Sequence, residues 1–400
     1  MRTAPMLQFP LDEYEQRINS LYSVLEKGGF TAALMTNEDN LRYFCDYRSA
    51  LWNNEYESPA MLVAVPGRLV LVTSTRTVQT ALATCCLDEG DIFAYDGFGE
   101  AACPEALAPA IVDTLRKLGA VSGKLGTEIG PMSRMRITYN DRAAIFDALP
   151  GLESADVSVP VLDVRGLKSP RELEIMRENC RMAVDAFKIA ADKVVLGETT
   201  EEDFYHNYAA ASYDLGADDF ALQLVVEFGP DRMQPNGVAG PRVYSDPDWC
   251  IFADSGPTLK GYASDMIRMA KLAPPTAEQQ RLMDIVLGCH ALVVPMIKPG
   301  TTFKEVVEAS DNYMREKGAD GFCMTIGLLG HGFGQDVHEP PMITLSTEGC
   351  FKKGMVFTLE PTLLHPTEGQ FAIENNYTVT EDGCELLTPQ LQGFYIPERS

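Results

Sequence analysis

The sequence contains only five histidines and two tryptophans in 400 residues, and it lacks the patterns that define several classes of protein. No window reaches 18 consecutive apolar residues, so the sequence predicts no membrane-spanning helix. The first residues, MRTAPMLQFPLDEYEQRI, reach acidic side chains before any apolar segment, which is not the pattern of a secretory signal peptide. We therefore expect a cytoplasmic protein that has no membrane partner.

The cysteines and basic residues argue against three further classes of protein: disulfide-bonded, zinc-finger and nucleic-acid-binding proteins. The ten cysteines are scattered, with one adjacent pair (Cys85 and Cys86) and no CxxC motif, so neither a disulfide framework nor a zinc-finger spacing is present. Lysine and arginine total 33 against 57 acidic residues, which gives a formal net charge of −24. Such a field repels phosphate backbones, and the sequence therefore argues against a nucleic-acid partner.

The first 160 residues alternate between helical and strand patterns. Apolar residues at helical spacing predict a helix from Leu11 to Leu25, which Gly28 and Gly29 end. Short apolar runs predict strands, namely TAALMT, AMLVAV, RLVLVTS and DIFAYD. Helical stretches are expected between them near 76–87, 105–118 and 132–148. This alternation predicts an α/β domain over residues 1–162.

A capping box predicts where the helical part of a second domain, residues 163–400, begins. Ser169 is expected to cap a helix with Pro170 at its first position and Glu172 closing the box. We expect this helix to run to Gly197 and a second helix to follow Thr199 and Thr200. Apolar strands, two helices (275–296 and 303–317) and more strands are expected after it. Helices grouped between strands favour an α+β domain.

Two candidate hairpins in the second half carry acidic residues where a strand should be apolar. In WCIFADSGPTLKGYASDMIRM, Asp254 is expected to end one strand and Asp265 to lie within the next. In GMVFTLEPTLLHPTEGQFAIENNYTV, Glu360 and Glu374 lie on candidate paired strands. Between the hairpins, GLLGHGFGQDVHEPP holds two histidines seven residues apart, His331 and His338.

Burying four carboxylates without a cation costs on the order of several kcal/mol. Basic residues are scarce nearby, and Arg268 is the main protein candidate for that cation. Four acids and an imidazole suit divalent ions such as Mn²⁺, Fe²⁺, Co²⁺ or Zn²⁺, and a pair of ions would match the charge. Each residue alone also fits a turn, a hydrogen-bonded loop or a solvated acid. A single site explains all of them together.

Four segments carry a resemblance to a known superfamily: DSGPTLKGYASDMIR, GHGFGQDVHEPP, FTLEP and AIENNYTVTEDGCELLT. They resemble the signature segments of the pita-bread metallohydrolases, which include Xaa-Pro aminopeptidase, prolidase, methionine aminopeptidase and creatinase. VRGLKSPRELEIMRENC is similar to the beginning of that superfamily's catalytic domain. The resemblance implies a creatinase-type N-terminal domain, a pita-bread (creatinase-like) catalytic domain and a homodimer, in which one N-terminal domain can reach the partner's active site.

The resemblance also implies a role for each candidate residue. Two divalent metal ions (Mn, Fe, Co or Zn) would be held by five ligands: Asp254, Asp265, His331, Glu360 and Glu374. Asp265 and Glu374 would bridge the ions, and Glu360 would also accept the proton of a bridging water that attacks an amide bond. His338 would contact the substrate and stabilise the charged intermediate. The glycines would let the backbone approach the metal.

Four positions depart from the pattern of the proline-specific members. Asn236 occupies the place of a substrate histidine, and Gly327 that of another histidine common in prolidase-like members. Ala372 replaces a frequent arginine, and Asn375 replaces a common acidic residue. Such a pattern is expected when a scaffold keeps its metal chemistry and changes its substrate.

The function we expect is that of a dinuclear-metal-dependent hydrolase resembling Xaa-Pro peptidases. The alternative is a metal-dependent hydrolase or lyase acting on a small solute, either an ectoine- or creatine-like C–N compound or dimethylsulfoniopropionate. LRYFCDY…LWN and AGPRV faintly resemble the lyases of that last compound. A metal-free binding module is a third possibility, which the complete ligand set disfavours. Asn236 and His338 are candidate substrate contacts, as is Trp52 with Tyr47 or Tyr56, although aromatic core residues are the alternative.

Overall fold

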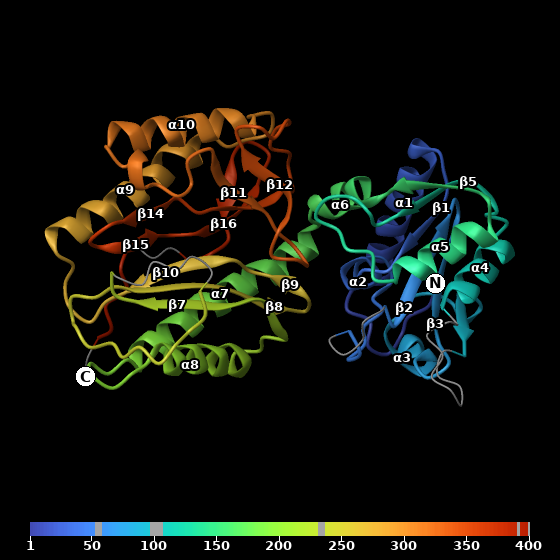
Figure 1. The fold of residues 1–400 in the computed structure, drawn as a ribbon, viewed down its shortest axis with the longest axis horizontal. Helices are drawn as coiled ribbons and strands as arrows, with labels where there is room; N and C mark the ends of the chain where they lie inside the picture. The colour runs from blue at the N-terminus through green and yellow to red at the C-terminus, as the bar shows by residue number, and fades with distance from the viewer. Residues whose placement is uncertain (53–57, 97–106, 231–236, 390–392, 399–400) are drawn as a thin grey trace. The chain divides into compact units, whose positions relative to one another are not determined.

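The computed structural model describes residues 1–52, 58–96, 107–230, 237–389 and 393–398. These divide into two compact units, Met1–Arg165 and Gly166–Ser400, whose elements are labelled in Figure 1. No helix in the described part of the chain combines the length and the apolar character needed to cross a membrane.

The first unit is built on a six-stranded mixed sheet in the order β4-β3-β2-β1-β5-β6. β1 pairs antiparallel with β2 and parallel with β5. Helices α4 and α5 pack on one face of the sheet through an apolar core, while α1 contacts β1, β2 and α2. The strands are β1 Phe30–Met35, β2 Ala60–Val65, β3 Arg68–Ser74, β4 Ile92–Tyr95, β5 Ser122–Thr127 and β6 Gly151–Asp156. The helices are α1 Leu11–Gly28, α2 Glu38–Cys45, α3 Val78–Thr84, α4 Leu107–Lys117, α5 Tyr139–Ala148 and α6 Ser158–Gly166.

Most of the expected pattern of this unit is confirmed. The four apolar runs form β1 to β4, and α1 ends where Gly29 adopts a left-handed φ of 64°. The helix expected from residue 132 is shorter, because the Thr138 side chain caps it by accepting a hydrogen bond from the Asp141 N–H. The last helix of the unit, α6, was not expected.

The second unit holds two main antiparallel sheets with a pair of helices outside each (Figure 1). Helices α7 and α8 pack on the sheet β10-β8-β7, whose strand β9 also pairs with β8. Helices α9 and α10 pack on the sheet β12-β11-β13-β16-β17 and on the hairpin β14–β15. The helices are α7 Pro170–Asp192, α8 Glu201–Asp214, α9 Ala277–Val293 and α10 Phe303–Glu316. The strands are β7 Asp219–Phe228, β8 Ile251–Leu259, β9 Tyr262–Ala263, β10 Met266–Ala270, β11 Leu328–Gly332, β12 Glu339–Thr344, β13 Val356–Leu359, β14 Thr362–His365, β15 Gly369–Ala372, β16 Asn375–Val379 and β17 Cys384–Leu386.

Helix α7 begins as predicted and ends earlier than predicted. Its capping box is formed by Ser169 and Glu172, with Pro170 in the first turn. The helix stops at Asp192 rather than Gly197, because the Val195 N–H donates to the Thr199 hydroxyl and the Gly197 N–H to the Tyr244 carbonyl. These bonds turn the chain before α8.

The register of the sheet β10-β8-β7 decides what lies on each of its faces. Asp254 of β8 pairs with Val225 of β7 and with Ile267 of β10. Directly paired residues share a face of a sheet. Leu224 and Ala253 face the helices, so Asp254 lies on the other face. On that face Val225, Phe252 and Ile267 form a small buried apolar cluster with Ala372 of β15.

Candidate metal centre

The first hairpin differs from its prediction in where the two carboxylates lie. β8 continues past Asp254 to Leu259, so Asp254 is inside a strand, whereas Asp265 directly precedes β10. The turn explains the difference: Lys260 and Gly261 have φ values of 50° and 74°, and they return the chain to pair with the end of β8. The two carboxylates still converge, with oxygens within 4.8 Å of each other and of the Glu374 carboxylate.

In the second hairpin both glutamates lie just outside paired strands. Glu360 follows β13 and Glu374 precedes β16, and these strands pair through Leu359 and Asn375. The hairpin β14–β15 occupies the chain between them. The Glu360 N–H donates to the Leu329 carbonyl at 3.0 Å, and the Glu374 N–H donates to the Ile267 carbonyl at 3.2 Å. Backbone bonds therefore tie Glu360 to β11, which carries His331, and Glu374 to β10, which directly follows Asp265.

His331 lies in β11 with its ring between the backbone and the carboxylates. Its Nδ1 is 3.0 Å from the Gly332 carbonyl oxygen, and its Nε2 is 3.4 Å from one oxygen each of Asp265 and Glu360. Burial, followed by the charge of His338, lowers the pKa of His331 to about 4. A neutral ring with Nδ1–H bonded to a carbonyl directs the lone pair of Nε2 at the acids, which is the tautomer that binds a metal.

The candidate side chains form three overlapping groups whose ligand atoms lie within 4.8 Å of one another. The groups are Asp265–His331–His338, His331–Glu360–Glu374 and Asp254–Asp265–Glu374. They contain all five residues expected as ligands, together with His338, whose side chain is exposed. Residues spread over more than a hundred positions of sequence therefore meet at one place.

Without a cation, the charged forms of the four carboxyl groups are destabilised. Burial raises the pKa of Glu360 to about 8 and that of Asp254 to about 7. Burial, followed by neighbouring acids, raises the pKa of Asp265 and Glu374 well above the usual range. One oxygen of Asp254 and one of Glu374 are buried without a hydrogen-bond partner among the described residues. Buried acids of this kind are fully ionised at neutral pH only beside a cation.

Arg268 is not that cation, which corrects our expectation. Its buried guanidinium donates to the backbone carbonyls of Glu374 (2.5 Å) and Ile267 (2.9 Å) and to the Asn375 side chain (2.9 Å). Desolvation lowers its pKa to about 10. In the described part of the chain, the neutral His331 ring is the only Lys, Arg or His side chain with a nitrogen within 4.0 Å of these four carboxylates. Four acids and one neutral imidazole fit hard or borderline divalent ions.

The glycines of GHGFG make room for neighbouring protein atoms, and their expected role beside a metal stays a prediction. A Cβ on Gly330 would collide with the Thr358 carbonyl oxygen, and one on Gly332 would lie 2.5 Å from the Pro340 carbonyl oxygen. A Cβ on Gly334 would lie 2.5 Å from the Glu339 carboxylate. The glycines therefore let neighbouring strands and one acidic side chain close around β11.

Sequence reasoning missed the residues that support the site. The Asn376 amide oxygen accepts a bond from the Asp265 N–H at 3.1 Å, and its NH₂ group donates to the Asp265 carbonyl. Lys168 and Glu339 form a buried ion pair of 3.1 Å beside the two histidines. An acid directly after His338 was a visible signal, whereas nothing in the sequence connects Lys168 to it.

The candidate substrate contacts outside this cluster are placed only in part. Asn236 and Tyr56 lie outside the described residues. Trp52 is buried, with Tyr47 edge-on to its ring and the Arg136 guanidinium 5.4 Å from the ring centroid. Both aromatics thus pack inside the first unit, and the role of Trp52 in binding substrate stays a prediction.

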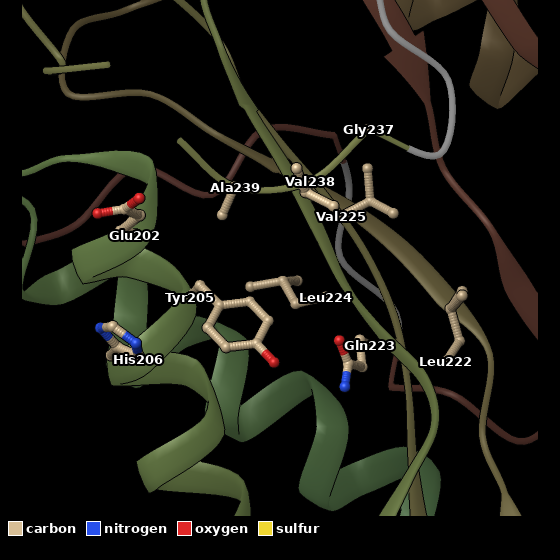
Figure 2. A pocket seen from close by; sticks show the side chains of 10 residues that line it. All are labelled: Glu202, Tyr205, His206, Leu222, Gln223, Leu224, Val225, Gly237, Val238 and Ala239. Atoms are coloured by element: carbon tan, nitrogen blue, oxygen red, sulfur yellow. The ribbon is translucent and has the colours of Figure 1, made fainter. Parts of the chain in front are cut away.

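A cavity of about 500 Å³ lies between α8 and β7, and none of the five candidate ligands lines it (Figure 2). Side chains of α8 form one wall, β7 forms the other, and residues 237–239 close one end. The lining includes Tyr205 and His206 of α8, Leu222 and Gln223 of β7, and Val238. The carboxylate cluster is therefore a separate feature of the unit.

Two family models match the chain and cover most of it. Residues 174–381 match metallopeptidase family M24, and residues 17–166 match the creatinase/prolidase N-terminal domain. The chain belongs to metallopeptidase family M24. This confirms the expected superfamily and fold class, and it identifies the chain as a metal-dependent hydrolase.

Relatives and solved structures agree with this assignment. An uncharacterized peptidase from Staphylococcus saprophyticus is 30% identical over 253 residues, 63% of this chain and 71% of the relative. Another from Bacillus subtilis is 26% identical over 93% of this chain and 97% of the relative. The fold is similar to that of the Xaa-Pro dipeptidase from Bacillus anthracis, with a TM-score of 0.81 at 24% identity, covering 96% of this chain and 100% of that one. A dipeptidase from Pyrococcus horikoshii gives 0.82 at 21% identity, covering 94% and 99%.

The raised carboxyl pKa values predict how the metal-free protein responds to pH. Unfolded carboxyl groups titrate near pH 4, so the folded state of Glu360 and Asp254 binds protons more tightly. Their contribution to stability is fully present below about pH 4 and is lost as the pH rises through about 7 to 8. We expect the Tm of chelator-treated protein to fall between about pH 6.5 and pH 8.5, and less so in Glu360→Gln. Circular dichroism melts test this, and a rising Tm would contradict it.

Proposed function

We propose that the protein is a dinuclear metal-dependent peptidase that hydrolyses the Xaa-Pro bond of short peptides. The observation that carries the proposal is the convergence of one neutral imidazole and four cation-deficient carboxylates in a member of family M24. Asp254, Asp265, His331, Glu360 and Glu374 would hold two divalent ions. We further propose that the protein is cytoplasmic and that it forms a homodimer, the latter as the resemblance implies.

Each side chain contributes to the reaction in its own way. The ions, when bound, supply Lewis acidity and lower the pKa of a water molecule to near neutrality. The Glu360 side chain is 19% exposed, so it can reach a substrate and suits a proton acceptor that can also deliver the proton to the leaving nitrogen. The exposed His338 ring lies 4.2 Å from the His331 ring and suits a donor to the developing oxyanion.

The comparisons favour a peptide over a small solute. The relatives and solved structures reported above carry the names peptidase, dipeptidase and Xaa-Pro dipeptidase. Ala372 occupies the place of the arginine found in many proline-specific members, and it is buried among Val225, Phe252 and Ile267. No guanidinium is therefore available at this position to pair with an anionic group of the substrate. We therefore expect Xaa-Pro peptides without an additional anionic group to be preferred.

A substrate panel tests this function directly. The full-length protein, loaded with Mn²⁺, is assayed with matched Xaa-Pro and Xaa-Ala dipeptides, and with osmolytes and sulfonium compounds. We expect kcat/KM for Xaa-Pro to exceed that for Xaa-Ala by about tenfold or more, a discrimination of roughly 1.4 kcal/mol. Turnover of solutes without turnover of any dipeptide would refute the proposal.

His338→Ala is expected to reduce kcat without releasing metal. A donor to the oxyanion contributes about 10² to 10³ in kcat. Because we assign His338 to the substrate and not to the ions, metal content measured by mass spectrometry should stay at the wild-type value. Loss of metal from this variant would show that His338 is a ligand.

A further inference from the structure

The residues between the two histidines fold around a single buried carboxylate. β11 ends at Gly332 and β12 begins at Glu339, so residues 333–338 form the connection. Oε1 of Glu339 accepts hydrogen bonds from the Gln335 N–H at 3.0 Å and from the Asp336 N–H at 3.3 Å. Gly334 is required because a Cβ there would lie 2.5 Å from Oε2 of the same carboxylate. The conformation of the connection therefore depends on where the Glu339 side chain is held.

Lys168 holds that side chain from a segment 171 residues earlier in the sequence. Its Nζ lies 3.1 Å from Oε2 of Glu339, and both side chains are 2% exposed. The Lys168 N–H donates to the Gly354 carbonyl at 2.8 Å, which fixes the segment just before α7. Buried ion pairs contribute little net stability, but they can fix one arrangement among several. Such a pair can serve the geometry of the connection more than the stability of the fold.

The connection touches the candidate metal centre at both ends. Its Gly334 carbonyl accepts a hydrogen bond from the Ala263 N–H at 2.6 Å, two residues before Asp265. At its other end lies the His338 ring, tilted against the His331 ring at 4.2 Å. A shift of the Glu339 carboxylate would therefore move His338 relative to the ligands.

We propose that Lys168 and Glu339 are positioning residues that hold the His338 imidazole where it meets the substrate. Neither side chain contacts the reacting atoms; each acts through the connection at 333–338. The inference rests on the proposed function for its kinetic consequence, although the placement of His338 itself does not. A small misplacement of a catalytic group costs up to about a hundredfold in rate, which sets the size of the expected effect.

The test is a double-mutant cycle between Lys168→Met and His338→Ala. Kinetics are measured on the Mn²⁺-loaded full-length protein with an Xaa-Pro dipeptide. We expect Lys168→Met to lower kcat about 10- to 100-fold and to change KM less than about threefold. In the His338→Ala background the same substitution should change kcat less than about twofold, because the group it positions is absent. Equal factors in both backgrounds would overturn the proposal.

Matched variants separate positioning from general damage. Lys353→Met removes an exposed lysine whose partner, Glu381, is also exposed, and it should leave kcat and KM unchanged. Lys168→Met should keep the wild-type metal content. If Lys168→Met alone does not fold, the double variant Lys168→Met/Glu339→Gln removes both charges of the pair together. It should show the same low kcat, and wild-type kcat in it would also overturn the proposal.

A second readout does not depend on catalysis. The His338 ring signals of the metal-free full-length protein are assigned by their loss in His338→Ala, and then compared by NMR between wild type and Lys168→Met. We expect them to shift or broaden in Lys168→Met and not in Lys353→Met. Unchanged signals would refute the positioning role. Displaced signals in a protein that hydrolyses no Xaa-Pro peptide would refute the proposed function alone.

Discussion

Glu360→Gln is expected to lower kcat for an Xaa-Pro dipeptide by about a thousandfold, within the range of general-base contributions. The amide keeps the shape of the side chain but cannot accept the proton of the attacking water. The substitution also removes one negative charge from a cluster whose carboxyl groups already have raised pKa values. The folded state should therefore persist, which circular dichroism would verify alongside the kinetics.

A matched control and a second measurement distinguish two roles of Glu360, general base and metal ligand. Glu381→Gln makes the same change at a side chain that is 79% exposed, and it should leave kcat unchanged. Saturating Mn²⁺ restores occupancy if the variant only binds metal more weakly, and kcat should then stay low. Recovery of turnover at high Mn²⁺ would show that Glu360 is a ligand but not the base.

Asp265→Asn is expected to abolish most of the stabilisation that a divalent ion gives the folded protein. At 100 times Kd, binding to the native state adds about 2.7 kcal/mol, which raises the Tm of a unit of this size by about 5–10 °C. Asp265 belongs to two of the three ligand groups, so its loss should reduce the rise to about 2 °C or less. Differential scanning calorimetry with and without Mn²⁺ measures both proteins.

The same variant gives an opposite result without metal. Because Asp265 is a buried acid with a raised pKa, replacing it by a neutral amide should stabilise the metal-free protein at pH 8. Asp185→Asn, at a side chain 49% exposed, serves as the control and should alter neither measurement. An equal Mn²⁺-induced rise in Tm for Asp265→Asn and wild type would place the bound ion elsewhere.

Local patterns predicted the fold where local forces decide it. The capping box of Ser169 and Glu172 begins α7, and the left-handed Gly29 ends α1. Both depend on bonds within a few residues, so the sequence predicted both. The ends of α7 and β8 were not, because distant groups set them. The carbonyl of Tyr244 helps to stop α7, and pairing with β7 and β10 extends β8 beyond Asp254.

The candidate ligands were predictable as a set, whereas their supports were not. Asp254, Asp265 and Glu374 are acids within apolar runs. This pattern is visible in the sequence even when the pairing of the strands is unknown. Arg268 donates to backbone carbonyl groups rather than to the carboxylates. The sequence shows that an arginine lies near the acids, but not which oxygens it binds. Lys168 looks like an ordinary residue before a helix, because its partner Glu339 lies 171 positions away. Contacts over such separations depend on the completed fold.

The most direct test of the central claim is the metal content of the purified, dialysed full-length protein, measured by inductively coupled plasma mass spectrometry. Four buried carboxylates and one imidazole predict about two divalent ions per chain in wild type and fewer than about one in Asp265→Asn. Full turnover of an Xaa-Pro peptide by protein that holds only trace metal would contradict the account.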